Sequence, residues 1–174
     1  PTVDELDECL KALLRAKATG CDGTPIEFYK ELPTARRELF AFVQKVWVEE
    51  DVPKELVRGV FIPIFKEKGS PDDMEKYRYI CLLNHSFKLL SALMLRRTAV
   101  EVAKYLPEEQ AGFRKERGCR DNILLLSRII TNTLERGEEG VVVFLDYKAA
   151  FDSVSHLFLD ESLGVAGASD KTRA

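Results

Sequence analysis

The chain has 174 residues, of which 45% are apolar and 32% charged, and its formal net charge is −3. This composition is typical of a globular protein of one domain or a little more. No apolar stretch reaches membrane-spanning length and no signal peptide is present, so we expect no membrane partner and an intracellular location, nuclear or cytoplasmic. Four cysteines without zinc-like spacing and only two histidines argue against a structural zinc site. Because the chain starts at Pro1, without a methionine, we expect it to be part of something longer.

The charge is unevenly distributed along the chain. Residues 1–57 carry a balance of −4, residues 58–136 a balance of +5, and residues 137–174 again −4. A basic middle segment is where contacts to nucleic-acid phosphates would lie. The excess is modest, and ordinary solvated surface explains many of the same side chains.

The first third of the chain is predicted to be helical. A stripe of apolar residues at 3.6-residue spacing predicts a helix over residues 3–18, which the glycine-rich run 20–23 ends. Thr24 as N-cap and Pro25 in the first turn predict a short helix through residue 32. A further helix is expected over residues 33–50, with its aromatic residues packed in the core.

A β-hairpin is predicted next, with strands over 59–65 and 77–83 joined by a turn-rich segment. Pro63 indicates an edge position. Pairing that is symmetric about the turn at 70–73 places Lys66 opposite Arg78 on the same face, where the two cations repel each other. An anion such as a nucleoside triphosphate would remove that repulsion. On the residues alone, two solvated surface cations explain the pattern better.

Two longer helices, over about 84–105 and 120–136, flank a polar loop. In that loop QAGFR (110–114) combines a glycine, an aromatic ring and a guanidinium, so that the backbone can approach a ligand closely and Arg114 can reach a phosphate. Capping of local structure by Gln110 fits the same residues equally well. Lys115 and Arg117 extend the basic run, as does Arg120.

The five apolar residues 141–145 run without alternation, which predicts a strand buried on both faces. Asp146 follows where the chain would leave the sheet, a position in which a carboxylate can hold a divalent cation. A helical turn after Asp146 would bring Phe151 beside whatever Asp146 holds. Helix capping by Asp146 is an equally good interpretation of these residues alone. A last helix is expected from the Ser155 cap to about residue 166, ended by Gly167.

The segment FLDYKAAFDSV (144–154) resembles motif A of reverse transcriptases of the non-LTR retrotransposon type. Four further blocks occur in the order that this family uses: GCDGTPIEFYK (20–30), IPIFK (62–66), YRYICLLN (77–84) and QAGFR (110–114). The resemblance implies an α+β fold: helix-rich fingers with an antiparallel β-hairpin, plus the first strand and helix of a right-hand palm. The expected divisions are a helical N-terminal extension (1–57), fingers with the hairpin and long helices (58–136) and a partial palm (137–174).

The same resemblance implies an RNA-directed DNA polymerase, with an RNA template, a DNA primer and dNTPs as partners. Asp146 would be the catalytic carboxylate, holding Mg²⁺ or Mn²⁺ together with the carbonyl of Tyr147, with two ions only in the complete enzyme. Phe151 matches the steric gate against a ribose 2′-hydroxyl. The dNTP-binding residues would be Lys66, Arg78, Tyr147 and Phe151, and the nucleic-acid-binding residues Arg114, Lys115 and Arg117.

The sequence departs from the family pattern in several places. Tyr79 stands where the family has proline, and Arg120 where it commonly has a small residue. No Ala-Asp-Asp segment is present, so we expect the isolated chain to be inactive and to self-associate through its unpaired palm strand. The alternative is a non-catalytic nucleic-acid-binding or self-association module derived from a retroelement. A phosphatase with an aspartyl nucleophile is disfavoured, because Lys148 occupies the place of its second acid.

Overall fold

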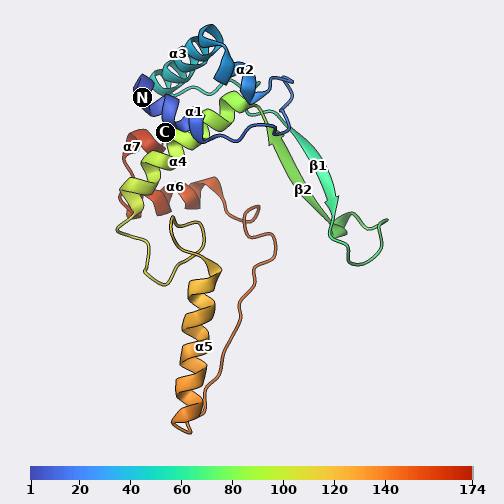
Figure 1. Ribbon diagram of the computed structural model, residues 1–174, viewed down its shortest axis with the longest axis vertical. Coiled ribbons are helices and arrows are strands. Elements are labelled where there is room, and N and C mark those ends of the chain that lie inside the picture. Colours follow the sequence, from blue (N-terminus) through green and yellow to red (C-terminus); the bar gives the residue numbers. More distant parts are fainter. Residues whose placement is uncertain (174) are drawn as a thin grey trace. The chain divides into compact units, whose positions relative to one another are not determined.

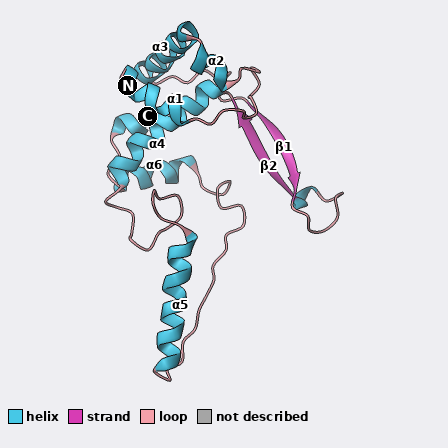
Figure 2. Ribbon diagram, viewed as in Figure 1, coloured by secondary structure: helices cyan, strands magenta, loops and turns pink. Residues whose placement is uncertain are grey.

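Helices dominate the structure, a computed structural model that describes residues 1–173 (Figures 1 and 2). Within this range the chain forms one two-stranded antiparallel sheet, which confirms the α+β class. The described residues divide into two compact units, Pro1–Arg97 and Thr98–Arg173, and the boundary falls inside one helix. No helix within residues 1–173 is both long and apolar enough to cross a membrane.

The first unit contains three helices, the β-hairpin and most of a fourth helix. Its elements are α1 (Val3–Ala12), α2 (Ile26–Glu31), α3 (Pro33–Glu49), β1 (Gly59–Phe65), the 3₁₀ turn η1 (Met74–Lys76), β2 (Tyr77–Leu83) and the start of α4 (His85–Val102). The second unit contains the end of α4 and then α5 (Cys119–Glu135), α6 (His156–Val165) and α7 (Asp170–Arg173).

Helix α1 begins at a capping box and ends six residues earlier than predicted. Thr2 Oγ1 accepts a hydrogen bond from the Glu5 N–H (3.2 Å), and the Thr2 N–H donates to the Glu5 carboxylate (3.4 Å). The expectation of a helix to residue 18 is wrong, because Lys30 Nζ donates to the Leu13 carbonyl and the Ala16 N–H donates to Glu27 (2.6 Å). These bonds satisfy backbone groups outside a helical conformation.

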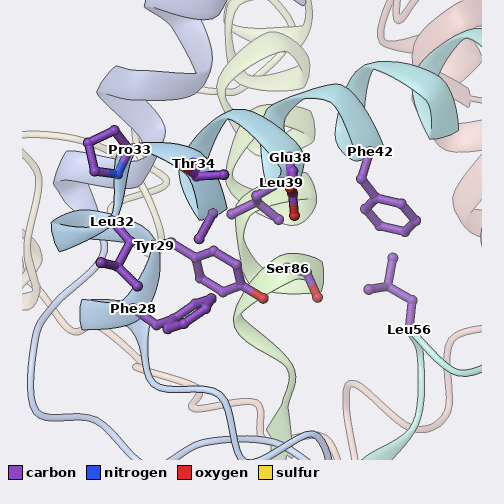
Figure 3. A pocket seen from close by; sticks show the side chains of 11 residues that line it. Phe28, Tyr29, Leu32, Pro33, Thr34, Glu38, Leu39, Phe42, Leu56 and Ser86 are labelled. Carbon is purple, nitrogen blue, oxygen red and sulfur yellow. The ribbon is translucent and has the colours of Figure 1, made fainter.

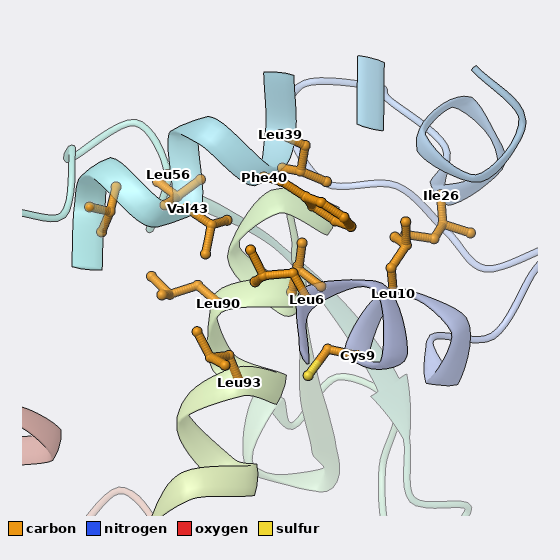
Figure 4. Packing of buried hydrophobic residues seen from close by; sticks show 12 residues of the cluster. Leu6, Cys9, Leu10, Ile26, Leu39, Phe40, Val43, Leu56, Leu90 and Leu93 are labelled. Carbon is orange, nitrogen blue, oxygen red and sulfur yellow. The ribbon is translucent and has the colours of Figure 1, made fainter. Parts of the chain in front are cut away.

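The core of the first unit lies among α1, α2, α3 and α4 (Figure 4). Its fully buried aliphatic side chains come from all four helices: Leu6, Leu10, Ile26, Val43, Leu89 and Leu93. An ion pair joins the first and last of these helices beside this core. Arg97 donates to both carboxylate oxygens of Glu5, at 2.8 and 2.7 Å, and its guanidinium lies 4.3 Å from the ring centroid of Trp47.

The loop before α2 is held against the start of α4. The Asp22 N–H donates to Asn84 Oδ1 (3.4 Å), and the ring Nδ1 of buried His85 lies 3.0 Å from the Thr24 carbonyl. Gly20 is required for this approach, since a Cβ there would come within 2.4 Å of the Asn84 backbone nitrogen. The block 20–30 of the sequence therefore positions the chain where the hairpin meets α4.

The hairpin has the predicted strands but a different register. Ile64 pairs with Arg78 and Phe65 with Tyr77, and the Lys66 N–H donates to the Lys76 carbonyl (2.8 Å). The expectation that Lys66 lies opposite Arg78 is therefore wrong by two residues, because η1 moves the centre of the turn toward the N-terminus. The alternation of hydrogen-bonded pairs places Pro63 in a non-hydrogen-bonded pair, where its missing N–H removes no ladder bond.

The second unit is held by polar contacts around its last two helices. Ser155 caps α6 as predicted, its Oγ accepting from the Phe158 N–H (3.1 Å), and Gly167, at a φ of +90°, follows the helix end. Arg173 donates to both carboxylate oxygens of Asp160 at 2.8 Å. This contact lowers the pKa of Asp160.

The expectation of a buried strand over 141–145 is wrong for this structure. Residues 141–147 form no helix or strand, and the apolar side chains are exposed, Val141 by 90% and Leu145 by 79%. A strand exists only when a neighbouring strand satisfies its N–H and C=O groups. Among the described residues no strand pairs with this segment.

Candidate nucleotide and nucleic-acid site

Three cations lie at the turn end of the hairpin. Lys66 continues β1 and lies opposite Lys76, and Arg78 is two residues further along the second strand. Because side chains alternate between the faces of a strand, Lys66 and Arg78 lie on the same side as diagonal neighbours, whereas Lys76 belongs to the 3₁₀ turn η1. Lys66 and Arg78 therefore share a face as predicted, but the residue directly opposite Lys66 is Lys76 and not Arg78.

The three cations differ in what already neutralises them. Lys76 Nζ lies 3.5 Å from the Asp73 carboxylate. Lys66 Nζ donates to the carbonyl of Glu75 (2.8 Å), a neutral group. Within residues 1–173 no carboxylate lies within 4 Å of Lys66 or Arg78. These two side chains are therefore the ones whose charge is available to an anion.

Asp146 lies at the start of an irregular turn in the second unit. The chain leaves the exposed apolar run at Asp146 and makes one turn that is closed by the Ser153 N–H donating to the Ala149 carbonyl (3.0 Å). Ala149 adopts a left-handed φ of +50°. The side chains of Asp146 and Tyr147 are exposed. Asp146 is therefore not the cap of a regular helix, since α6 begins ten positions later at His156 with Ser155 as its cap.

Phe151 contacts an aromatic residue that the sequence did not single out. Its ring lies edge-on to that of Phe113, with centroids 6.1 Å apart and planes at 87°. Both side chains are largely exposed, Phe113 by 98% and Phe151 by 80%, so neither is a core residue in this structure. Phe113 also has a φ of +59°, a conformation that bulky residues rarely adopt. The contact brings the QAGFR loop beside the turn that follows Asp146.

The basic loop holds two of its three predicted cations in internal contacts. Arg114 donates to the Pro107 carbonyl (2.6 Å) and lies 3.8 Å from Glu108, and Arg117 forms an ion pair with the same carboxylate. The Lys115 side chain is 93% exposed, and its Nζ lies 3.8 Å from the Glu116 carboxylate. An exposed pair of this kind contributes little, so the charge of Lys115 is the most available of the three. Gln110 donates to the Gly112 carbonyl (3.5 Å), a contact within the loop.

The described residues do not by themselves form a complete cation site. No group of three or more His, Cys, Asp or Glu side chains within residues 1–173 is placed to hold a metal ion. Asp146 and the Tyr147 carbonyl supply one carboxylate and one neutral oxygen, whereas Mg²⁺ is usually held by one or two carboxylates together with substrate phosphates and waters. All four cysteines are free thiols in the described structure.

The predicted residues are distributed over both units. Lys66 and Arg78 belong to Pro1–Arg97, whereas Asp146, Tyr147 and Phe151 belong to Thr98–Arg173, together with the basic loop. Sequence reasoning missed Phe113 as a contact of Phe151 and Lys76 as the cation facing Lys66. The aromatic residue within QAGFR was the available signal for Phe113. The length of the loop between the strands was the signal for Lys76.

Comparison with known proteins supports the interpretation of these motifs. Residues 65–171, more than half of the chain, match the family described as reverse transcriptase (RNA-dependent DNA polymerase). The chain belongs to this family. The matched segment contains Lys66, Arg78, the basic loop and the turn that follows Asp146.

Several proteins of mobile elements are similar to the chain. It is 28% identical over 158 residues to the RNA-directed DNA polymerase from mobile element jockey of Drosophila melanogaster, a match that covers 89% of the chain and 17% of that protein. It is 27% identical over 174 residues to the Pol polyprotein from the type-1 retrotransposable element R2 of Popillia japonica, of which the match covers 23%. An uncharacterized 149 kDa protein of transposon TX1 of Xenopus laevis is 24% identical over 159 residues. The chain thus spans less than a quarter of the length of these relatives.

Proposed function

We propose that the chain is the nucleotide-holding part of an RNA-directed DNA polymerase that extends a DNA primer with dNTPs on an RNA template. The observation that carries this proposal is the family match over residues 65–171. Lys66 and Arg78, which have no carboxylate within 4 Å among the described residues, lie within the matched segment. The relatives that carry the name RNA-directed DNA polymerase support the proposed reaction.

Lys66 and Arg78 are the proposed contacts of the triphosphate. Arg78 offers a planar fork of N–H donors that suits two phosphate oxygens, and Lys66 offers a compact charge beside it. An anion between them removes the repulsion of two cations on one face of a two-stranded ribbon. Lys76 is a weaker candidate, since Asp73 already neutralises it.

Asp146 and the Tyr147 carbonyl are the proposed protein ligands for the divalent ions that this family generally uses. Because the described residues do not complete such a site, the remaining ligands must come from substrate or from protein outside them. We propose that Phe151 limits the space beside the nucleotide sugar, and that Phe113, at 6.1 Å, supports its ring. Template contacts are assigned to the basic loop: Lys115 is free to reach phosphates, whereas Arg114 and Arg117 hold the loop in shape.

A second proposal concerns self-association. The apolar run 141–145 is exposed, and Val141 and Val142 line a hollow with Ile129 and Ile130 of α5, whose side chains are also exposed. Exposed apolar surface and unpaired backbone recruit other chains. We propose that the isolated chain associates with itself through this segment.

The free thiols support an intracellular site of action.

Primer extension tests the nucleotide assignment. In a polymerase that carries residues 1–174, Arg78→Gln should raise the KM for dNTP about tenfold, because about 1.5 kcal/mol of charge-assisted hydrogen bonding is lost. Lys76→Gln is the matched control, a neighbouring cation that Asp73 neutralises, and should change KM little. Equal effects of the two substitutions would contradict the assignment of Arg78.

A further inference from the structure

The first unit contains an apolar hollow that the polymerase assignment does not use. It has a volume of about 570 Å³ and lies between α2, α3, the start of α4 and the segment before β1 (Figure 3). With the exception of Ser86 its lining residues precede residue 65, so they lie outside the segment that matches the reverse transcriptase family. Its apolar walls are formed by Phe28, Tyr29, Leu32, Leu39, Phe42 and Leu56.

The walls are suited to a large apolar side chain. Phe28 and Tyr29 pack edge-to-face, with ring centroids 5.5 Å apart and planes at 82°. Phe28 and Leu32 remain 45% and 47% exposed. A ligand that covers these side chains would remove apolar surface from water, which favours binding. The volume is that of pockets that bind small organic groups.

The polar groups at the hollow define the charge of its ligand. Glu38 is the one charged side chain among its described lining residues, and no cation within residues 1–173 lies within 4 Å of its carboxylate. The arginines that precede it on α3, Arg36 and Arg37, line a separate hollow, where Arg36 pairs with Asp7 at 3.1 Å. Burial raises the pKa of the Tyr29 phenol, which therefore stays neutral.

We propose that this hollow is a docking site for a basic segment of a protein partner. The segment inserts one aromatic or branched apolar side chain, and a lysine or arginine beside it pairs with Glu38. The charge of the hollow favours a basic segment over a nucleic acid. Glu38 is the one charge among the described lining residues, so the hollow attracts a cationic group and disfavours the phosphates of a nucleic acid. The hollow shares no residue with the proposed nucleotide site, which consists of Lys66 and Arg78 on the hairpin and of Asp146, Tyr147 and Phe151 in the second unit.

The test uses the 174-residue chain and three probes: a short blocked peptide with one tryptophan between two arginines, the same peptide with two glutamates, and a short single-stranded RNA. Amide chemical shifts report where each probe binds. The arginine peptide should shift the amides of Tyr29 and Leu39 and bind at least about threefold more tightly than the glutamate peptide, the value of one exposed ion pair. RNA should leave these amides unchanged.

Two variants complete the test, with a control. Glu38→Gln should remove the preference for the arginine peptide, and Glu38→Arg should reverse it in favour of the glutamate peptide. Asp4→Asn, an acid on α1 that does not line the hollow, should preserve the preference. Glu38 is exposed, so these substitutions leave the core intact. Shifts that fall elsewhere, a preference that survives Glu38→Arg, or displacement of the peptide by RNA would each overturn the proposal.

Discussion

Replacement of Arg97 tests the contact that joins α1 to α4 in the first unit. Arg97 reaches both oxygens of the partly buried Glu5 carboxylate, at 2.8 and 2.7 Å, and covers the Trp47 ring at 4.3 Å. Arg97→Met keeps the apolar stem of the side chain but removes both interactions. We expect a loss of about 2–3 kcal/mol in the free energy of unfolding, from one bidentate charge-assisted pair and one cation–π contact.

Urea unfolding followed by tryptophan fluorescence measures this loss, because Trp47 is the chain's one tryptophan and lies in the contact itself. Arg96→Met is the matched control: its partner Glu8 lies at 2.5 Å, but both side chains are more exposed than the Glu5–Arg97 pair. Its effect should be clearly smaller. A double-mutant cycle with Glu5→Gln should show coupling of about 1–2 kcal/mol. Equal losses for Arg97→Met and Arg96→Met, without coupling to Glu5, would refute this reasoning.

Two further measurements concern the same chain. The hydrogen bond from Arg97 lowers the pKa of Glu5 below its ordinary 4.5. The contribution of Glu5 to stability is therefore complete above pH 4.5 and is lost as the pH falls below that value. Urea midpoints should fall more steeply below pH 4.5 in the wild type than in Glu5→Gln, and parallel curves would contradict this. Sedimentation equilibrium should show self-association that Val143→Lys weakens, since a charge in the exposed apolar run opposes its burial; a wild-type monomer at high micromolar concentration would contradict the role of that run.

The hairpin and the bounds of most helices were predictable because their signals are local. Runs rich in apolar and aromatic residues, joined by a turn-rich segment, marked β1 and β2, and Pro33 and Ser155 marked the starts of α3 and α6. The register depends on the 3₁₀ turn at Met74–Lys76, which a symmetric turn does not anticipate. An error of two residues keeps each side chain on its face, so the shared face of Lys66 and Arg78 was still predicted correctly.

The strand over 141–145 could not be predicted reliably, because a strand is not a local structure. An apolar run shows that a segment can be buried between other elements, but its partner strand must exist to satisfy the backbone. The Phe113–Phe151 contact was missed for a related reason: it joins two irregular segments, in which no periodicity indicates direction. The roles of Asp146, Tyr147 and Phe151 in the reaction remain predictions.

The most direct test of the central claim is template-dependent incorporation of a single dNTP by a polymerase that carries residues 1–174. The account predicts that Asp146→Asn reduces the rate at least about 10³-fold, since it removes a proposed ligand of the catalytic ions. Asp152→Asn, a carboxylate in the same turn with no proposed role in ion binding, should reduce it far less, and both variants should unfold at the same urea concentration as the wild type. Incorporation by Asp146→Asn at the wild-type rate would contradict the claim that this chain carries a catalytic carboxylate of an RNA-directed DNA polymerase.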